Sequence, residues 1–504
     1  MQIADASLQG GYQTGPSPAD ALVRRPDARS VEPILAPAAD WTRDLRRDEK
    51  SFSMMAPLAL RSESEWAEFG RALEQAKRAG AQSISTDVWW GMIETGDGQY
   101  DFSYYDRLAD LITSHGLKWT PILSFHQCGG NVGDDVNIPI PAYLRDKYAG
   151  LSDDGPAAAF CRSEQGNVSY ESISPWASKA VLSEYREVMV AFQNHFSRRK
   201  DQIAEINVSL GPAGELRYPS YNSHDEGTDY PNRGALQAYS ELAIASFREW
   251  AHKKYGSVEA VAQAWETTLG NEKEILPPSD PESFYGRGDD KHTQYGRDFF
   301  DWYNGSLVEH GRRILQTAID VFGKEESPFT GIELGAKIPG IHWRTGGDRA
   351  AELNAGLIRT SDLMQTRTVR DPSYAYEPLA ELFADLQDEP NAPPMVLHFT
   401  CLEMRDGPDD DPFGRRPRSL VEWVGRAARR HDVTLKGENA LPVANEDGWR
   451  AIGTALEHDG YAGLTLLRLP TSAENLQGFK ELAQRYGQPQ HAGAAAALRA
   501  MEAQ

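Results

Sequence analysis

Eight short apolar segments alternate with stretches of helical periodicity along most of this 504-residue chain. Each segment has the length of a strand and few charged residues, which is typical of a parallel strand buried on both faces. Eight strand–helix units with right-handed crossovers close into a parallel barrel, so the predicted fold class is α/β, a (β/α)8 TIM barrel. The predicted strands are residues 52–60, 81–90, 118–125, 202–210, 328–335, 394–402, 432–437 and 460–469.

Three segments that follow predicted strands are too long for ordinary loops. They cover residues 126–175, 211–290 and 336–394. Loops beyond about 12–15 residues are uncommon in compact domains and are often functional. Barrel enzymes keep their catalytic residues on the loops at the carboxyl ends of the strands. We therefore expect these long loops to form a lobe over the C-terminal face of the barrel.

The chain divides into an arm and a barrel. Residues 1–48 are rich in Pro, Ala, Asp and Arg without periodicity, which predicts a poorly ordered N-terminal arm. Residues 49–504 are expected to form the catalytic barrel with a C-terminal extension. We find neither a signal-peptide pattern nor an apolar run of about eighteen residues, so we expect no contact with a membrane. The predicted location is cytoplasmic, and export by another route stays open.

The net charge of the chain limits the classes of partner that it is expected to bind. A formal net charge of −22 argues against binding to nucleic acid or to an anionic membrane surface, because both need basic patches. A neutral sugar substrate is compatible with this charge. The three cysteines are odd in number and widely spaced, so we predict neither a disulfide framework nor a zinc site. We expect a monomer.

The motif GPAGELRYPSY, residues 211–221, places Glu215 on a turn directly after a predicted strand. Glycine and proline end the strand and allow the tight turn. A carboxylate at this position in a barrel favours catalysis, whereas most glutamates elsewhere cap helices or lie on the surface.

A second motif, GENALP at residues 437–442, places Glu438 just past another predicted strand. Only a closed fold brings two glutamates so far apart in the sequence together. Two carboxylates that face each other across a cleft are the minimal equipment for hydrolysing a glycosidic bond. The sequence therefore favours a glycoside hydrolase.

Polar and aromatic residues also follow the other predicted strands. Glycines between residues 129 and 133 predict a mobile lid, although such a segment is more often merely a loop. The histidines stand far from other residues of ligand type, so we predict no metal site and no cofactor. The motifs are DVWWGMIE (87–94), SFHQCGGNVGDDVNIPIPAY (124–143), AKIPGIHW (336–343), HFTCLEMRD (398–406) and LLRLP (466–470).

Taken together, these motifs resemble those of the beta-amylases, the inverting exo-hydrolases of starch. The likeness keeps the same order from about residue 52 to about residue 470. It implies a (β/α)8 barrel that releases β-maltose from the non-reducing end of α-1,4-glucans. Glu215 would be the general acid, with a pKa raised by burial, and Glu438 the base that activates water. An inverting pair stands roughly 6.5–9.5 Å apart.

The resemblance also implies substrate-binding residues. Asp87 and His126 would hold hydroxyls of the terminal glucose, and Asp134 would close on the bound sugar. Thr400 would assist the base or hold the leaving sugar, and Leu441 would lie between sugar units. The remaining assignments are Lys337 and Arg468 as partners of substrate or carboxylates, Asn439 as an amide near the base, and His342 as a further substrate-binding residue.

The sequence departs from the family at two places. Plant members carry an acidic residue eight positions before the acid, where this chain has Asn207. A nearby carboxylate raises a neighbour's pKa, so its absence predicts a more acidic upper limb of the pH profile.

The second departure is at residues 255–270, which resemble part of the barrel beta-galactosidases and not the usual loop of the family. Two alternatives therefore stay open, a related glycosidase with a changed substrate and a catalytically silent barrel that binds glucan.

Overall fold

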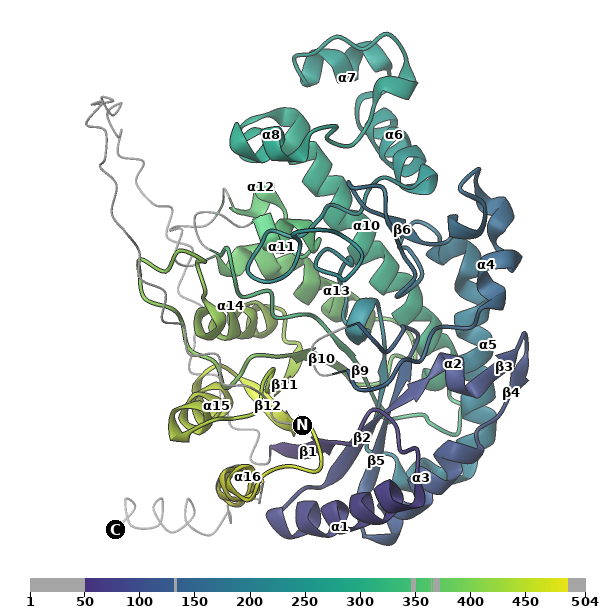
Figure 1. The fold of residues 1–504 in the computed structure, drawn as a ribbon, viewed down its shortest axis with the longest axis vertical. Coiled ribbons are helices and arrows are strands. Elements are labelled where there is room, and N and C mark those ends of the chain that lie inside the picture. Colours follow the sequence, from purple (N-terminus) through teal and green to yellow (C-terminus); the bar gives the residue numbers. More distant parts are fainter. Residues whose placement is uncertain (1–49, 131–133, 346–349, 364, 366–371, 488–504) are drawn as a thin grey trace. The chain divides into compact units, whose positions relative to one another are not determined.

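The computed structural model describes residues 50–130, 134–345, 350–363, 365 and 372–487 (Figure 1). The predicted N-terminal arm lies outside these residues, as does the end of the predicted C-terminal extension. The described residues belong to one compact unit.

Eight parallel strands close into a barrel, in the order β1-β12-β11-β10-β9-β8-β5-β2. This confirms the predicted fold class, and each predicted strand overlaps an observed one. The closing pair is β1 and β12, the first and last strands of the barrel. The strands are β1 Ser51–Met55, β2 Ser83–Trp89, β5 Lys118–Ser124, β8 Glu205–Val208, β9 Glu333–Lys337, β10 Met395–Phe399, β11 Thr434–Glu438 and β12 Tyr461–Leu466.

A helix follows each barrel strand before the next strand begins. The first of them starts at a capping box, in which Ser62 and Glu65 satisfy each other's backbone amides. At the other end of the chain, Lys50 N donates to Tyr486 O at 2.9 Å, so both ends of the described unit meet. The eight helices are α1 Glu63–Ala79, α3 Ser103–Ser114, α5 Ser178–Phe196, α10 Gln294–Ala318, α13 Glu377–Gln387, α14 Pro417–Arg430, α15 Glu446–His458 and α16 Ala473–Tyr486.

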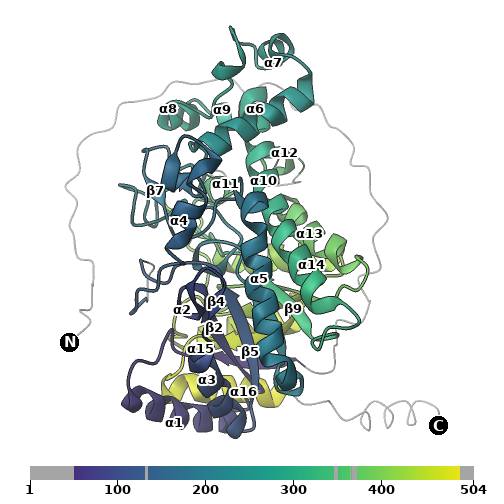
Figure 2. The same cartoon turned by 90° about the vertical axis from the view of Figure 1, so that its right-hand side faces the viewer.

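The long loops after β5, β8 and β9 form the lobe predicted over the C-terminal face. They are bonded to one another, since Glu164 N donates to Leu236 O at 2.8 Å and Asn354 Nδ2 donates to Gly234 O at 2.7 Å. Figures 1 and 2 both show α6, α7 and α8 at the opposite end from α1 and α16. The lobe contains α4 Tyr143–Lys147, β6 Cys161–Arg162, β7 Val168–Ser169, α6 Glu241–Tyr255, α7 Val258–Ala264, α8 Pro281–Gly286, α9 Asp289–His292, α11 Ala350–Asn354 and α12 Thr360–Leu363.

Smaller elements complete the description. The 3-10 helix η4, Pro212–Gly214, follows β8, and the short helix α2, Trp90–Ile93, follows β2. A hairpin of β3 Glu94–Gly96 and β4 Gln99–Tyr100 comes next. None of the described helices has both the length and the apolar character needed to cross a membrane. All three cysteines are buried free thiols, and the cytoplasmic location stays a prediction.

The interior of the barrel is polar, whereas its outer wall is apolar. On β2, Ser83, Ser85 and Asp87 line cavities inside the barrel. Ile84 lies between the two serines and Val88 follows Asp87, and both are buried in the hydrophobic core. Successive side chains of a strand point to opposite faces, so one strand serves both surfaces. Barrel interiors are usually filled with branched aliphatic side chains, and the polar filling here leaves space for two cavities.

Candidate active site

A pocket of about 1130 Å³ opens at the carboxyl ends of the barrel strands. Each of the eight strands, or the loop that follows it, contributes at least one residue to its wall. Successive contributions from β1 to β12 are Met55, Asp87, His126, Glu215, Lys337, Thr400, Glu438 and Arg468.

Glu215 follows η4 and points into the pocket. The turn before it requires Gly214, whose φ is +80° and where a Cβ would lie 3.3 Å from the ring of His126. Leu216 N donates to Lys337 O at 2.8 Å, which fixes this segment against the end of β9. The Glu215 carboxylate accepts a hydrogen bond from Arg217 Nε at 3.0 Å. Backbone pairing thus places Glu215 beside Lys337.

The surroundings of Glu215 favour its protonated form. Burial raises the pKa of its carboxyl, and the negative charge of Glu438 adds to this effect. The positive charges of Arg217 and Lys337 lower the pKa but do not cancel the rise. A carboxyl with a raised pKa can carry a proton to a substrate, which is what a general acid needs.

Glu438 is the last residue of β11, and Lys337 Nζ lies 2.6 Å from its Oε1. Burial disfavours the charged form of Lys337, but the charges of Glu438 and Glu215 outweigh this and raise the pKa of its ammonium group. Lys337 therefore stays cationic, and it interacts electrostatically with both glutamates. Glu215 and Glu438, the two residues predicted to be catalytic, thus interact with the same lysine.

A network behind the pocket wall holds the loop after Glu438. The carboxylate of Glu403 accepts hydrogen bonds from Ala440 N and Leu441 N. The side chain of Asn439 is fully buried; its Nδ2 donates to Leu441 O at 2.9 Å and its Oδ1 accepts from Leu467 N at 2.9 Å. The Asn439 amide lies outside the pocket lining and joins two loops, whereas the sequence placed it beside the base.

Asp87, His126 and Arg468 form another part of the wall. Ser124 Oγ donates to Asp87 Oδ1 at 2.9 Å, and Arg468 Nη1 lies 3.6 Å from Asp87 Oδ2. His126 Nδ1 lies 2.8 Å from Ser209 Oγ. Burial, with the nearby positive charges of Lys337, Arg217 and Arg468, lowers the pKa of His126 to about 3. The imidazole is therefore neutral at ordinary pH and suited to hydrogen bonding with hydroxyl groups.

The remaining predicted residues also line the pocket. Thr400 is buried, and Leu441 is 51% exposed at the mouth. His342 Nδ1 contacts Gly340 O at 3.0 Å. Asp134 Oδ2 accepts from Gly129 N at 2.8 Å, and residues 131–133 of the predicted lid lie outside the described residues. The structure brings all the predicted site residues except Asn439 into one pocket lining.

Sequence analysis did not assign roles to two buried residues that contact predicted site residues. Arg217 is 2% exposed, bonds Glu215, and stacks at 4.2 Å on the ring of Tyr221. The signal was present, since an arginine two positions after Glu215 projects to the same side of an extended segment. Ser209 could not be found this way, because its contact with His126 joins residues far apart in the chain.

Two groups of side chains in the described part of the chain have the geometry for a metal ion, and neither lies in the pocket. One is Asp97, Glu184 and Glu187, where Lys147 Nζ already lies 2.8 Å from Asp97 and 2.9 Å from Glu184. The other is Glu377, Glu381 and His431, where Glu377 pairs with Arg430. A lysine or arginine thus already neutralises part of the charge in each group.

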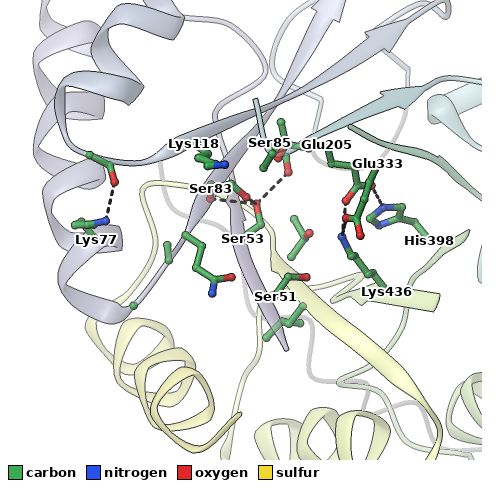
Figure 3. A pocket seen from close by; sticks show the side chains of 18 residues that line it. Ser51, Ser53, Lys77, Ser83, Ser85, Lys118, Glu205, Glu333, His398 and Lys436 are labelled. Carbon is green, nitrogen blue, oxygen red and sulfur yellow. Dashed lines mark hydrogen bonds and ion pairs between the residues drawn. The ribbon is translucent and has the colours of Figure 1, made fainter. Parts of the chain in front are cut away.

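A second cavity, of about 710 Å³, lies at the amino ends of the strands (Figure 3). Four of its lining residues, Glu205, Glu333, His398 and Lys436, are called the base network below. Glu205 contacts His398 Nε2 at 2.5 Å and Lys436 Nζ at 2.7 Å. Burial acts to raise the pKa of Glu205, but these two contacts outweigh it and lower the pKa to about 2. A carboxylate that stays ionised cannot serve as a general acid, and none of the predicted site residues lines this cavity.

Comparisons with known proteins agree with the geometry of the pocket. The model of glycosyl hydrolase family 14 matches residues 53–488. The chain is 38% identical over 458 residues to a beta-amylase from Bacillus cereus, covering 89% of this chain and 77% of that protein. It is 37% identical over 443 residues to a beta-amylase from Cytobacillus firmus, covering 86% of each.

Solved structures show the same likeness. The catalytic domain of a beta-amylase from Paenibacillus polymyxa matches with a TM-score of 0.75 and 36% identity, covering 88% of this chain and 99% of that one. A beta-galactosidase from the psychrophilic Marinomonas ef1 matches with a TM-score of 0.52 and 14% identity, covering 86% of this chain and 59% of that one. This second match is a likeness of fold alone.

Proposed function

Because the chain belongs to glycosyl hydrolase family 14, we propose a division of the reaction between its two pocket glutamates. The protein is a glycoside hydrolase that cleaves α-1,4-glucosidic bonds of starch-like glucans from the non-reducing end and releases β-maltose with inversion. The contact of Lys337 with Glu438, next to a Glu215 carboxyl with a raised pKa, carries the proposal.

Glu215 is the general acid. Its proton passes to the glycosidic oxygen as the bond from that oxygen to C1 breaks, so the leaving sugar departs as a neutral alcohol. Arg217 holds the carboxyl in place through the hydrogen bond to Oε2. Once the proton has left, Arg217 and Lys337 stabilise the carboxylate.

Glu438 is the general base. It takes a proton from a water molecule whose oxygen attacks C1 on the face opposite the broken bond, so an α-linkage yields a β-anomer. One water is consumed, and the proton left on Glu438 returns to Glu215 through solvent. Lys337 orients the Glu438 carboxylate, and the carboxyl groups of Glu438 and Glu215 are expected to stand roughly 6.5–9.5 Å apart to leave room for the water.

The other pocket residues bind the glucan. Asp87 and neutral His126 accept or donate hydrogen bonds to hydroxyls of the terminal glucose, and Arg468 orients Asp87. Thr400 acts beside the base, and Leu441 packs between sugar units at the mouth. Asp134 and His342 bind further hydroxyls, and Asn439 positions the loop that carries Leu441. The protein acts as a monomer without a cofactor.

Proton NMR of fresh digests of maltohexaose tests the proposal, because anomeric signals are read before mutarotation. We expect β-maltose as the only early product from the wild type and none from Glu215→Gln or Glu438→Gln. Early α-maltose would overturn the inverting pair. The absence of reducing sugar would favour a changed substrate or a barrel that only binds glucan.

A further inference from the structure

Exposed apolar side chains gather at the mouth of the pocket. The large hydrophobic residues that are exposed in the described part of the chain are Tyr230, Leu276, Tyr374, Phe413 and Leu441. Tyr230 and Leu441 line the pocket, and Phe413 lies two residues before Arg415, which also lines it. Single exposed apolar residues are common on protein surfaces, whereas a group beside a pocket marks a place for a ligand.

Tyr230, Phe413 and Arg415, called the outer rim below, come from two different loops and meet at one guanidinium group. The Arg415 guanidinium lies 5.8 Å from the centre of the Phe413 ring and also interacts with the Tyr230 hydroxyl. Tyr230 is 48% exposed and Phe413 is 41% exposed. Two aromatic faces and a cationic donor therefore lie next to one another and partly open to solvent.

Hydrogen bonds join the loops of the rim and hold it in place without a ligand. Arg344 N donates to Phe413 O at 2.7 Å, and Trp343 Nε1 donates to Asn232 O at 2.7 Å. The Tyr230 ring packs edge-on against Trp343 with their centres 5.3 Å apart. A surface held in its binding conformation loses little entropy when it binds.

Hydrogen bonds to Asp411 also fix Arg415 in place. The buried carboxylate of Asp411 accepts hydrogen bonds from Arg415 N at 2.7 Å and from Arg415 Nε at 2.8 Å. The Arg415 side chain nevertheless stays 42% exposed. The arginine is thus fixed in place, with part of its guanidinium free to meet a ligand.

We propose that the outer rim is an additional glucan subsite, which binds glucose units on the reducing-end side beyond those nearest the cleaved bond. The proposal rests on the function proposed above. An exo-enzyme that admits the non-reducing end must let the rest of the chain leave through the mouth, where the rim lies. A glucose ring offers an apolar face that packs on aromatic rings and hydroxyls that accept hydrogen bonds from a guanidinium group.

The rim makes the enzyme prefer long chains. Maltotetraose fills only the subsites around the cleaved bond, whereas maltoheptaose and amylose extend further toward the mouth. The ratio of kcat/KM for amylose to kcat/KM for maltotetraose measures the contribution of the rim, because an effect on chemistry cancels in this ratio. We expect this ratio to fall about tenfold in the double variant Tyr230→Ala/Phe413→Ala, mainly through KM for amylose.

Tyr374→Ala is the matched control, because Tyr374 is 38% exposed, lies outside the pocket lining, and also has an arginine, Arg430, over its ring. The ratio should not change in this control. An unchanged ratio in the rim variant, or an equal loss on both substrates, would overturn the proposal. A wild-type enzyme that is inactive on both substrates would overturn the proposed function instead.

A binding measurement separates the rim from any effect on turnover. In a Glu438→Gln background, calorimetric titration with maltoheptaose should show weaker binding when Tyr230 and Phe413 are replaced by alanine, while titration with maltotetraose changes less. Equal affinities for maltoheptaose with and without the rim would contradict the subsite. Thermal melting of each variant verifies that the exposed substitutions leave the fold intact.

Discussion

The two ends of the barrel use the same kinds of side chain in different proportions. At the carboxyl end, Glu215 and Glu438 face one lysine, and of these two glutamates it is Glu215 that accepts a hydrogen bond from Arg217. At the amino end, both oxygens of Glu205 are bonded, one to His398 and the other to Lys436. Burial is the largest influence on both Glu205 and Glu215, yet the pKa of Glu205 falls and that of Glu215 rises.

The two glutamates differ in how completely nearby positive charges compensate the negative charge of the buried carboxylate. Two direct contacts overcome the cost of burying the Glu205 charge, so this group is fixed as an anion and serves the fold. Glu215 has a single contact with a cation and a second carboxylate nearby, so burial prevails. Of these two buried glutamates, Glu215 has the raised pKa that a general acid needs, because nearby positive charges compensate its negative charge only in part.

The largest effect is expected for the catalytic pair. Glu215→Gln and Glu438→Gln should each lower kcat by about 10²–10⁴-fold, because each removes a proton transfer. Steady-state kinetics on maltohexaose measures the loss, and circular dichroism verifies the fold. Glu205→Gln is the matched change at the other end of the barrel, and a loss of kcat as large as that of the catalytic variants would break the comparison.

Glu205→Gln should instead lower the free energy of unfolding by about 3–5 kcal/mol, because it leaves the Lys436 ammonium group without its buried partner. Urea unfolding at neutral pH measures this loss. Glu333→Gln is the control, with a smaller loss, since the Glu333 side chain is 32% exposed and makes one contact with Lys436.

The pH dependence of that loss follows from the lowered pKa. Glu205 titrates at about 2 in the folded protein, against an ordinary value of 4.5. Its contribution to stability is therefore complete above about pH 4.5 and disappears as the pH falls toward about 2. The difference in unfolding free energy between wild type and Glu205→Gln should shrink over this range, and a difference that grows on acidification would contradict the assignment.

Arg217→Gln should leave the negative charge of Glu215 with less compensation from positive charge. Removing this positive charge raises the pKa of Glu215 further, so the upper limb of the kcat/KM profile should move to higher pH. Profiles of both proteins on maltohexaose measure the shift. Arg233→Gln, in the lobe, provides a control of equal charge change, and a shift toward lower pH in Arg217→Gln would show that another group sets this limb.

The smallest effect is expected for Asn207→Asp. Asn207 lies on β8, lines the pocket, and in the described residues no hydrogen bond joins it to Glu215. An added carboxylate there raises the pKa of Glu215 through space, so the upper limb should again move to higher pH. Identical limbs in wild type and variant would remove Asn207 as an influence on the pH optimum.

The barrel was predictable because its strands are short apolar segments with clear ends, and those ends mark where Glu215 and Glu438 lie. The polar interior was missed, although the alternation of Ser83, Ser85 and Asp87 with Ile84 and Val88 indicated it. The two alternating faces of a strand are visible in a sequence, but which face meets a cavity depends on the closed barrel.

The roles of Asn439 and Arg217 could not be read in the same way. Asn439 follows Glu438 directly, yet hydrogen bonds of its amide with Leu441 O and Leu467 N hold it outside the pocket lining. The contact of Lys337 with Glu438 likewise joins two strands that are far apart in the sequence. Such contacts are set by how the strands pair around the barrel, which local sequence patterns do not record.

The pairing of β1 with β12, together with the hydrogen bond from Lys50 N to Tyr486 O, has a consequence for how the chain can be rewired. Joining residue 50 to residue 486 through a short linker and opening the chain between α14 and β11 gives a circular permutant. Such a permutant keeps every strand neighbour, while Glu438 moves close to the beginning of the polypeptide and Glu215 comes after it, near the middle. Glu438 is then synthesised before Glu215, and only closure of the barrel brings the two side chains into one pocket.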